Sequence, residues 1–369
     1  MPEETVDRFS TLMLPATLFL WRRSNRVKFD QSSHVDDDGL NLMSAQDRTL
    51  DRYQELMQIN AAAHVLRAAR EVGLFAELSN GQRTIEQLTK ALQLQEKTVK
   101  LLIDCLVSMN VLERYGDDHA LAPVMRLLCE HDTDLGDTSW SRLVDDLKVK
   151  STASRDTAYL NSIAATQWIH TPAAMQAAEI LDIGGQDNDG LAVNDKPFKV
   201  LDLGCGSAVW SCAMAYRDPN ARIVAVDNEA ALLAAQRTAN SIELGARFLP
   251  MIGDPETAEL PSSEFDLVVI AQRLHSATQQ ASERLLRQAI GSLAPGGRLV
   301  IIDLFLGPAK PRLSETIEAL RLHIETEQGQ MKTIKESESE LEKLGLVSAQ
   351  FTFIAASRIN LGMMVARKP

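Results

Sequence analysis

The sequence predicts an α/β protein with a mainly helical N-terminal domain and a C-terminal domain built on a mostly parallel sheet. Its 369 residues are too many for one ordinary domain and suit two. Residues 47–130 show helical spacing followed by two short strands. From residue 196 onward, short β-branched or apolar runs alternate with helical stretches, as in parallel strands that are buried on both faces.

Composition excludes several classes of function. With 45% hydrophobic and 24% charged residues, the chain can bury a core and is not disordered. Its net charge of −12 repels phosphate, and only 5% of its residues are aromatic, so we expect neither a nucleic-acid nor a membrane partner. No two of the four cysteines form a C-x-x-C pair, which predicts free thiols in a reducing, cytoplasmic compartment: Cys105, Cys129, Cys205 and Cys212.

Residues 1–46 are expected to be an arm and a linker. The apolar run Leu12–Trp21 is too short to span a bilayer, and Pro15 interrupts it. Acidic residues precede it, unlike the positive start of a signal peptide. A docking arm, packed on its own protein or on a partner subunit, and a poorly ordered terminus both remain open. The acidic stretch His34–Gly39 is expected to be a solvated linker.

Residues 47–130 have the pattern of a helix–turn–helix unit with a wing. A helix is predicted over about 47–80, and a short helix begins at Thr84. A longer helix from Glu96, a strand, a turn and a second short strand follow, which is the winged-helix arrangement. Its apolar residues could form the core of a monomer or serve a partner as well: Leu88, Leu92, Leu101, Leu102 and Leu106.

The remaining chain divides at a segment rich in Gly, Asn and Asp. Residues 131–195 are predicted to be a helical connector that contributes to a substrate pocket, and the segment Gly184–Pro197 marks its end. Residues 196–369 are predicted to form the sheet domain.

The sharpest motif is KVLDLGCGSA at Lys199–Ala208. A buried strand is predicted to end at Asp202, and Gly204 and Gly206 then turn the chain into a helix. Glycine lets a ligand approach the backbone, and the N-terminus of a helix attracts a carboxylate or phosphate. The third glycine of a dinucleotide motif is replaced by Val209, which counts against NAD and FAD. The motif predicts a different nucleotide-type cofactor.

Two more acidic residues follow successive predicted strands. Asp227 closes the next strand, 25 residues after Asp202, where a carboxylate can accept both hydrogen bonds of a ribose diol. Asp254 closes the third strand in IGDP, where it could hold an adenine amino group. An acidic residue at each of three successive strand ends is not what a purely structural explanation predicts.

With these motifs the sequence resembles the class I S-adenosylmethionine-dependent methyltransferases. More closely, it resembles the small-molecule O-methyltransferase group that has an N-terminal winged-helix dimerisation domain. The resemblance covers roughly residues 50–369 and also rests on QRLH and LAPGGRLVIID. It implies a Rossmann-like seven-stranded sheet with an antiparallel last strand, S-adenosyl-L-methionine as cofactor, and a homodimer formed through the N-terminal domain.

The resemblance also implies a cofactor site. The Gly204–Gly206 loop would take the methionine part, Asp227 the ribose and Asp254 the adenine. Gln272, just past the fourth strand, would line the methyl side of the cofactor. Three further residues complete the expected cofactor-binding set: Asp202, Asn228 and Pro255.

In the family, a histidine at the position of His275 removes the proton of the acceptor hydroxyl, and an orienting carboxylate falls at Asp303. The alternative is that His275 caps the following helix. Ser276 stands where many members have an acidic residue, and a further family glutamate falls near Met331. An acidic acceptor such as a phenol or enol, or a nucleophilic carbon, would need little help from a base.

In the family, the helices before the cofactor domain usually wall the acceptor pocket, and the resemblance therefore implies that the pocket includes Trp168, Met175 and Arg273. The alternatives are that Trp168 and Met175 are ordinary core residues and that Arg273 pairs with a surface carboxylate. The seven histidines form no HxH or HExxH pair, so no metal site is expected.

These observations favour methyl transfer from S-adenosylmethionine to a small molecule, most simply at a hydroxyl oxygen. One alternative is a DNA-binding ligand sensor, but the presumed second helix offers only Lys97 and Lys100, with Asp104 beside them. A second alternative keeps the fold and the cofactor but catalyses C-methylation or a reaction other than methylation.

Overall fold

The computed structural model describes residues 45–123, 125, 136–148, 156–184, 197–307 and 310–369. Within these ranges the chain forms two compact units that divide between Thr138 and Ser139. The predicted arm and linker, except for Ala45 and Gln46, and nearly all of the boundary segment before Pro197 lie outside the described residues. Ala45 and Gln46 are helical, so the first helix begins within the last residues of the predicted linker.

The first unit is a small helical unit with a short antiparallel sheet in the order β1-β3-β2. It has the predicted order of helix, turn, helix and hairpin. The expected helix over 47–80 is broken at Gly73, whose φ of +80° ends one helix and starts the next. The elements are α2 (Ala45–Glu71), α3 (Leu74–Ser79), β1 (Arg83–Thr84), α4 (Ile85–Leu92), α5 (Glu96–Ser108), β2 (Leu112–Tyr115) and β3 (Asp118–Leu121).

Helix α4 begins at Thr84, as predicted, through a capping box. The backbone N–H of Gln87 donates to Thr84 Oγ1 at 3.2 Å, and that of Thr84 donates to Gln87 Oε1 at 3.0 Å. The apolar faces of α4 and α5 then meet in one core that includes Leu88, Ile103 and Leu106. Leu101 points away from this core and is 58% exposed.

The second unit is built on a sheet in the order β10-β11-β8-β7-β4-β5-β6. Neighbouring strands from β4 to β8 are parallel, whereas β11 is antiparallel to both β8 and β10. This confirms the predicted, mostly parallel sheet with an antiparallel last strand. The strands are β4 (Phe198–Leu203), β5 (Ala221–Asp227), β6 (Phe248–Ile252), β7 (Phe265–Ala271), β8 (Leu293–Leu306), β10 (Val347–Phe353) and β11 (Leu361–Arg367), and the two-residue β9 (Lys332–Thr333) pairs with the end of β8.

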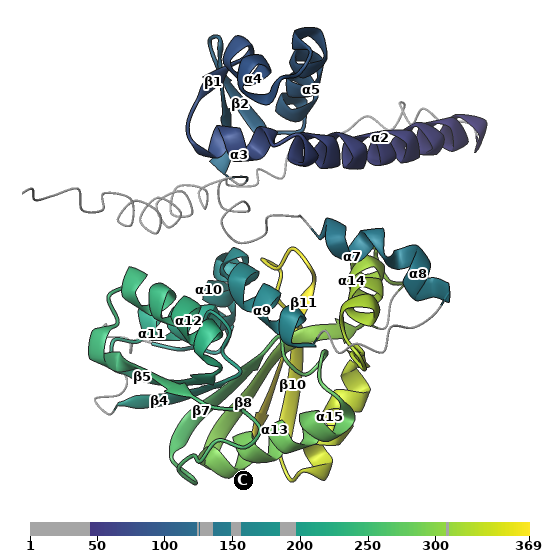
Figure 1. Cartoon of the computed structure of the whole chain (residues 1–369). Helices are drawn as coiled ribbons and strands as arrows, with labels where there is room; N and C mark the ends of the chain where they lie inside the picture. The colour runs from purple at the N-terminus through teal and green to yellow at the C-terminus, as the bar shows by residue number, and fades with distance from the viewer. Residues whose placement is uncertain (1–44, 124, 126–135, 149–155, 185–196, 308–309) are drawn as a thin grey trace, which may run out of the picture. The chain divides into compact units, whose positions relative to one another are not determined.

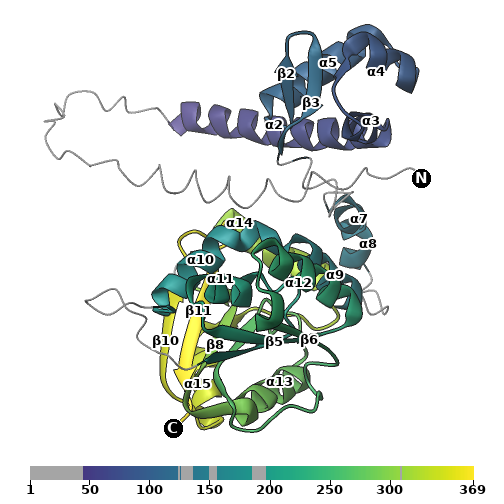
Figure 2. The same cartoon turned by 90° about the vertical axis from the view of Figure 1, so that its left-hand side faces the viewer.

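Helices cover both faces of this sheet, with α10, α11 and α12 on one side and α13 and α15 on the other (Figures 1 and 2). In the part of the chain that the structure describes, no helix is long and apolar enough to cross a membrane. The helices are α7 (Asp137–Ser141), α8 (Leu143–Lys148), α9 (Asp156–Thr166), η1 (Gln167–His170), α10 (Thr171–Ile180), α11 (Val209–Arg217), α12 (Glu229–Ser241), η2 (Gly245–Arg247), α13 (Gln279–Ser292), α14 (Leu313–Glu325) and α15 (Ile334–Lys343).

The central strands are buried on both faces, which explains their unbroken apolar sequence. Val200 of β4 belongs to the core on one face of the sheet, and its neighbour Leu201 belongs to the core on the other. From β4 the chain runs outward through β5 and β6 and then returns to place β7 on the opposite side of β4. The order reverses at this point, and ligands of such sheets bind at the carboxyl ends of the strands there.

Candidate active site

The loop after β4 needs both of its predicted glycines. Gly204 and Gly206 have φ of +72° and +55°, in the left-handed region that side chains rarely adopt. A Cβ on Gly206 would lie 2.7 Å from Gln167 Oε1, and one on Gly204 would lie 3.2 Å from Arg273 Cδ. Helix α11 starts directly after this loop, so its N-terminal N–H groups face the same place.

A narrow pocket lies beside this glycine loop. It brings together six predicted residues: Gly204, Gly206, Asp227, Asn228, Gln272 and Arg273. Leu160, Ile163 and Gln167, from α9 and η1, line it as well. Its volume is about 10 Å³, room for about one water molecule, so a nucleotide-sized ligand enters only if these side chains move.

Asp227, the last residue of β5, is hydrogen-bonded to the glycine loop. Its Oδ2 accepts a hydrogen bond from the backbone N–H of Gly206 at 3.0 Å. Its Oδ1 accepts from the backbone N–H and the side-chain Nδ2 of Asn228, at 2.8 and 3.1 Å. The carboxylate is therefore oriented at the edge of the pocket, and each oxygen has lone pairs that can accept further donors.

Asp202 lies under the same loop and is only 1% exposed. Ser211 Oγ donates to its Oδ2, while Oδ1 is buried and has no hydrogen-bond partner among the described residues. Burial, together with a smaller effect of the charge of Asp227, raises the pKa of Asp202 to about 7, although the hydrogen bond from Ser211 acts in the opposite direction. A buried acceptor without a donor fits a cationic group of a ligand.

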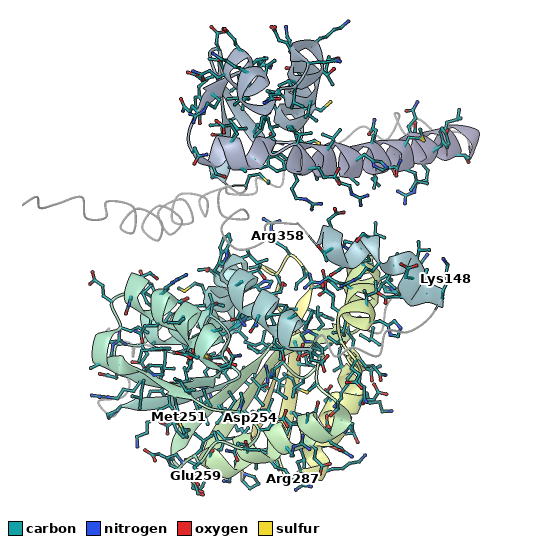
Figure 3. The ribbon with its side chains drawn as sticks, viewed as in Figure 1. Lys148, Met251, Asp254, Glu259, Arg287 and Arg358 are labelled. Carbon is teal, nitrogen blue, oxygen red and sulfur yellow. The ribbon has the colours of Figure 1, made fainter. Side chains whose placement is uncertain are left out.

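Asp254 and Pro255 follow β6 but do not line the pocket. Asp254 is exposed, and its Oδ1 accepts from the backbone N–H of Glu256 at 2.9 Å (Figure 3). Their role toward an adenine remains a prediction.

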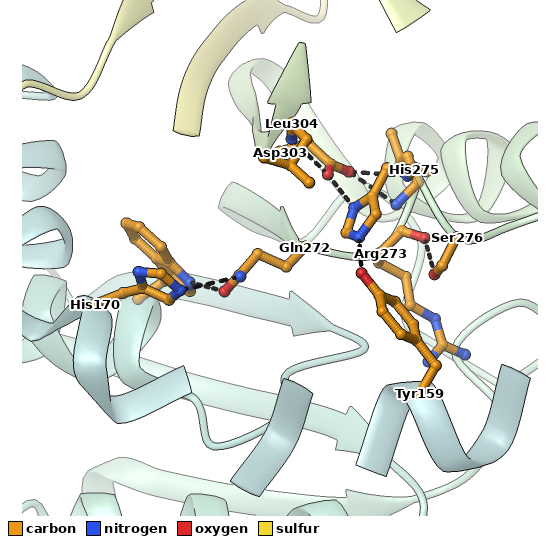
Figure 4. A network of polar contacts seen from close by, with 10 residues as sticks. Tyr159, His170, Gln272, Arg273, His275, Ser276, Asp303 and Leu304 are labelled. Carbon is orange, nitrogen blue, oxygen red and sulfur yellow. Dashed lines mark hydrogen bonds and ion pairs between the residues drawn. The ribbon is translucent and has the colours of Figure 1, made fainter. Parts of the chain in front are cut away.

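His275 lies at the carboxyl end of β7 and pairs with Asp303 of β8, and both are buried (Figure 4). His275 Nδ1 forms a short hydrogen bond with Asp303 Oδ1. Three backbone N–H groups, of Leu274, His275 and Leu304, also donate to this carboxylate at 2.8–3.2 Å. Because Asp303 is the acceptor, Nδ1 carries the proton and Nε2 presents a lone pair.

The structure contradicts the alternative that His275 caps the next helix. Helix α13 begins at Gln279, and its N-cap is Thr278, whose Oγ1 accepts from the backbone N–H of Ala281 at 3.1 Å. Ser276 Oγ, next to His275, donates to the backbone oxygen of Arg273 at 3.0 Å. Met331 is a buried core residue.

The hydroxyl of Tyr159, on α9, forms a hydrogen bond with Nε2 of His275, and the sequence did not predict this contact. Tyr159 Oη lies 2.7 Å from His275 Nε2 (Figure 4). Burial raises the pKa of the Tyr159 hydroxyl, which therefore keeps its proton and donates to Nε2. The guanidinium of Arg321, from α14, lies 5.7 Å from the centre of the tyrosine ring.

Gln272 links the pocket to two aromatic rings behind it. Its backbone has φ of +54°, and its Nε2 and Oε1 lie 3.2 Å from His170 Nε2 and 3.4 Å from Trp210 Nε1 (Figure 4). The His170 ring stacks on that of Trp210, with ring centres 6.0 Å apart. Burial lowers the pKa of His170 to about 4, so the ring is neutral and accepts from Gln272.

The three residues predicted for the pocket of the methyl acceptor do not lie together in the structure. Arg273 lines the glycine-loop pocket, whereas Trp168 and Met175 do not. Trp168 lies on η1 and is partly buried, and Met175 packs against the core beneath α10. Within the described ranges, no three His, Cys, Asp or Glu side chains gather as metal ligands.

Comparison with known proteins shows what this chain is similar to. Residues 200–297 match the family model described as a methyltransferase domain. Demethylmenaquinone methyltransferase of Thermus thermophilus is 33% identical over 114 residues, so the chain matches 50% of that relative's length and 31% of its own. The N,N-dimethyltransferase OxyT of Streptomyces rimosus is 25% identical over 339 residues, 86% of this chain and 96% of OxyT.

Solved structures share the architecture over nearly their full length. The mitomycin 7-O-methyltransferase MmcR superposes with a TM-score of 0.66 at 18% identity, over 88% of this chain and 99% of MmcR. Human N-acetylserotonin methyltransferase, solved in complex with S-adenosylmethionine, has a TM-score of 0.61 at 18% identity, over 89% and 99%. These likenesses confirm the fold that the sequence predicted.

Proposed function

We propose, on the premise that this chain is a class I S-adenosylmethionine-dependent methyltransferase, that it methylates a small-molecule acceptor at a hydroxyl oxygen. The observation that carries the proposal is the continuity of two sites along one segment. Residues 271–273 line the glycine-loop pocket, and His275, two residues later, pairs with Asp303. A cofactor pocket and a general base thereby adjoin at the carboxyl ends of β4 and β7.

The residues in and beneath the glycine loop fit S-adenosylmethionine. The unpartnered Oδ1 of Asp202 suits the ammonium of the methionine part, and the carboxylate of Asp227 suits the ribose diol. The N-terminus of α11 favours the negative end of the ligand. Gln272, fixed by His170 and Trp210, would line the methyl side. When bound, S-adenosylmethionine supplies an electrophilic methyl group on a sulfonium sulfur.

His275 is the proposed general base. Asp303 holds the proton on Nδ1 and leaves the lone pair of Nε2 to accept the proton of an acceptor hydroxyl. Tyr159 Oη now occupies that lone pair, so the hydroxyl of the acceptor must replace it. Arg273, beside Gly204, would attract an acidic acceptor to the same pocket.

Transfer to nitrogen is a second candidate. OxyT, whose name describes an N,N-dimethyltransferase, is similar to 86% of this chain. An amine acceptor would also use a base at Nε2, since an ammonium must lose its proton before it attacks a methyl group.

We further propose that the chain forms a homodimer through its N-terminal unit. Helix α2 carries five large apolar residues that are each more than half exposed: Leu50, Tyr53, Leu56, Met57 and Ile59. A contiguous apolar surface of this kind marks an interface in soluble proteins. Light scattering after size exclusion should give twice the chain mass for the wild type and the chain mass for the Leu56→Lys/Met57→Lys variant. A monomeric wild type would contradict this proposal.

The methylation proposal is tested by product formation. Purified protein is incubated with S-adenosylmethionine and a panel of phenols, enols and amines, and S-adenosylhomocysteine is quantified with the methylated product. Formation of both with a hydroxyl acceptor, strongly reduced in His275→Ala but not in His323→Ala, supports the proposal. His323 is the matched control because it is exposed on α14. Methylation of amines alone would support the second candidate instead.

A further inference from the structure

Gln167, on η1, has one satisfied and one unsatisfied polar atom. Its Oε1 accepts hydrogen bonds from the backbone N–H of Ser207 at 2.9 Å and from Ser207 Oγ at 3.2 Å. Its Nε2 is buried and has no hydrogen-bond partner among the described residues, although the whole residue is only 1% exposed. Because a backbone N–H can only donate, Oε1 must face Ser207, and this fixes Nε2 on the other side of the amide.

This unsatisfied donor belongs to the wall of the glycine-loop pocket. Gln167 lines the pocket with Gly206 and Asp227, and its Oε1 lies 2.7 Å from the place of a Cβ on Gly206. Buried amide donors are rarely left without an acceptor in native proteins. The structure therefore provides a fixed N–H group for a hydrogen-bond acceptor that the described residues do not contain.

A buried acceptor without a hydrogen-bond partner among the described residues lies at the same loop as this unsatisfied donor. Asp202 Oδ1 is a buried acceptor without a donor, two residues before Gly204, while Gln167 contacts Ser207, directly after Gly206. A lone acceptor and a lone donor at the two ends of one short loop match the ammonium and the carboxylate of an α-amino acid. The N-terminus of α11, at the donor end of the loop, favours the carboxylate there.

We infer that Gln167 binds the carboxylate of the methionine part of the cofactor through Nε2. This inference rests on the proposed function, because the ligand is the cofactor named there. Gln167 is then a residue that distinguishes the intact amino-acid end of the ligand from a shortened one. It acts in binding and takes no part in proton transfer.

Calorimetric titration with three ligands tests this role. S-adenosylhomocysteine has both charged groups, its decarboxylated amine has only the ammonium, and 5′-methylthioadenosine has neither. In Gln167→Met we expect the affinity for S-adenosylhomocysteine to fall at least tenfold and the affinities for the other two ligands to stay within twofold of the wild type. Gln236→Met, on α12 and outside the pocket lining, is the matched control and should change none of them.

A second variant keeps the test decisive if Gln167→Met does not fold. Gln167→Glu keeps the oxygen that accepts from Ser207 and replaces only Nε2, by a carboxylate oxygen that cannot donate and that repels another carboxylate. Above pH 8, this variant should therefore lose more affinity for S-adenosylhomocysteine than for the decarboxylated amine. An equal loss of affinity for all three ligands in both variants would show that Gln167 merely shapes the loop and would overturn the inference. If the wild type binds none of the three, the proposed cofactor itself is refuted.

Discussion

The buried carboxyl of Asp202 should lower the stability of the folded protein but contribute to ligand binding. Its carboxyl is buried, and its pKa of about 7 exceeds the ordinary value of 3.8 by about three units. At 1.36 kcal/mol per unit, the folded protein loses up to about 4 kcal/mol as pH rises from below 4 to above 7, because the folded state holds a proton that the unfolded state releases. Asp202→Asn is neutral at every pH and escapes this loss.

The variant should therefore be more stable than the wild type, and increasingly so at higher pH. The coupling between proton binding and folding predicts that the free energy of unfolding of the variant exceeds that of the wild type by about 2 kcal/mol at pH 5 and about 4 kcal/mol at pH 8.5. With roughly 2–4 °C in Tm per kcal/mol for a unit of this size, the Tm advantage should grow by about 4–8 °C between these two pH values. Ser211 can still donate to the amide oxygen, so that hydrogen bond is retained.

Differential scanning fluorimetry of both proteins from pH 5 to 8.5 is the assay, and calorimetry with S-adenosylhomocysteine completes it. We expect Asp202→Asn to melt higher and to bind the ligand at least tenfold more weakly, because the acceptor for the ammonium is gone. A Tm difference that does not change with pH, or a variant that binds as tightly as the wild type, would refute the reasoning.

Three other substitutions have defined outcomes. His275→Ala should lower kcat by about 10²–10⁴-fold without changing the affinity for S-adenosylhomocysteine, and a pure loss of ligand affinity would contradict a base role. Tyr159→Phe removes the hydrogen bond to Nε2. The KM of the acceptor should then fall about three- to tenfold in steady-state assays, and an unchanged KM would show that the acceptor does not displace Tyr159. Gly206→Ala should abolish ligand binding in calorimetry, whereas Gly245→Ala, with a similar φ of +53° but nothing within 4 Å, should not; equal effects would mean that backbone strain alone is responsible.

The sequence predicted the features that local patterns encode. Apolar runs gave the strands, Thr84 gave a helix start, and the glycine spacing located the loop. Such features depend on hydrogen bonds between near neighbours or on the alternation of a strand. The pairing of Asp303 with His275 was implied by the resemblance to the family and not by a local pattern, and the structure brings the two side chains together.

Tyr159 and Gln167 could not be predicted in this way. Tyr159 lies 116 residues from His275, and Gln167 lies 40 residues from Ser207. Both come from an alanine-rich helical stretch without a motif, and the short η1 rotates the side chains that follow it. The resemblance to the family led to Trp168 and Met175 as residues of the acceptor pocket, whereas the residue of η1 that lines the glycine-loop pocket is Gln167.

The central claim is that the glycine-loop pocket binds S-adenosylmethionine through Asp227. Calorimetric titration of the wild type, Asp227→Ala and the surface control Glu259→Ala with S-adenosylmethionine, S-adenosylhomocysteine and NAD tests it most directly (Figure 3). We predict micromolar binding of the two sulfur ligands, none of NAD, and loss of binding in Asp227→Ala alone. Binding of NAD, or binding of the sulfur ligands that survives in Asp227→Ala, would contradict the account.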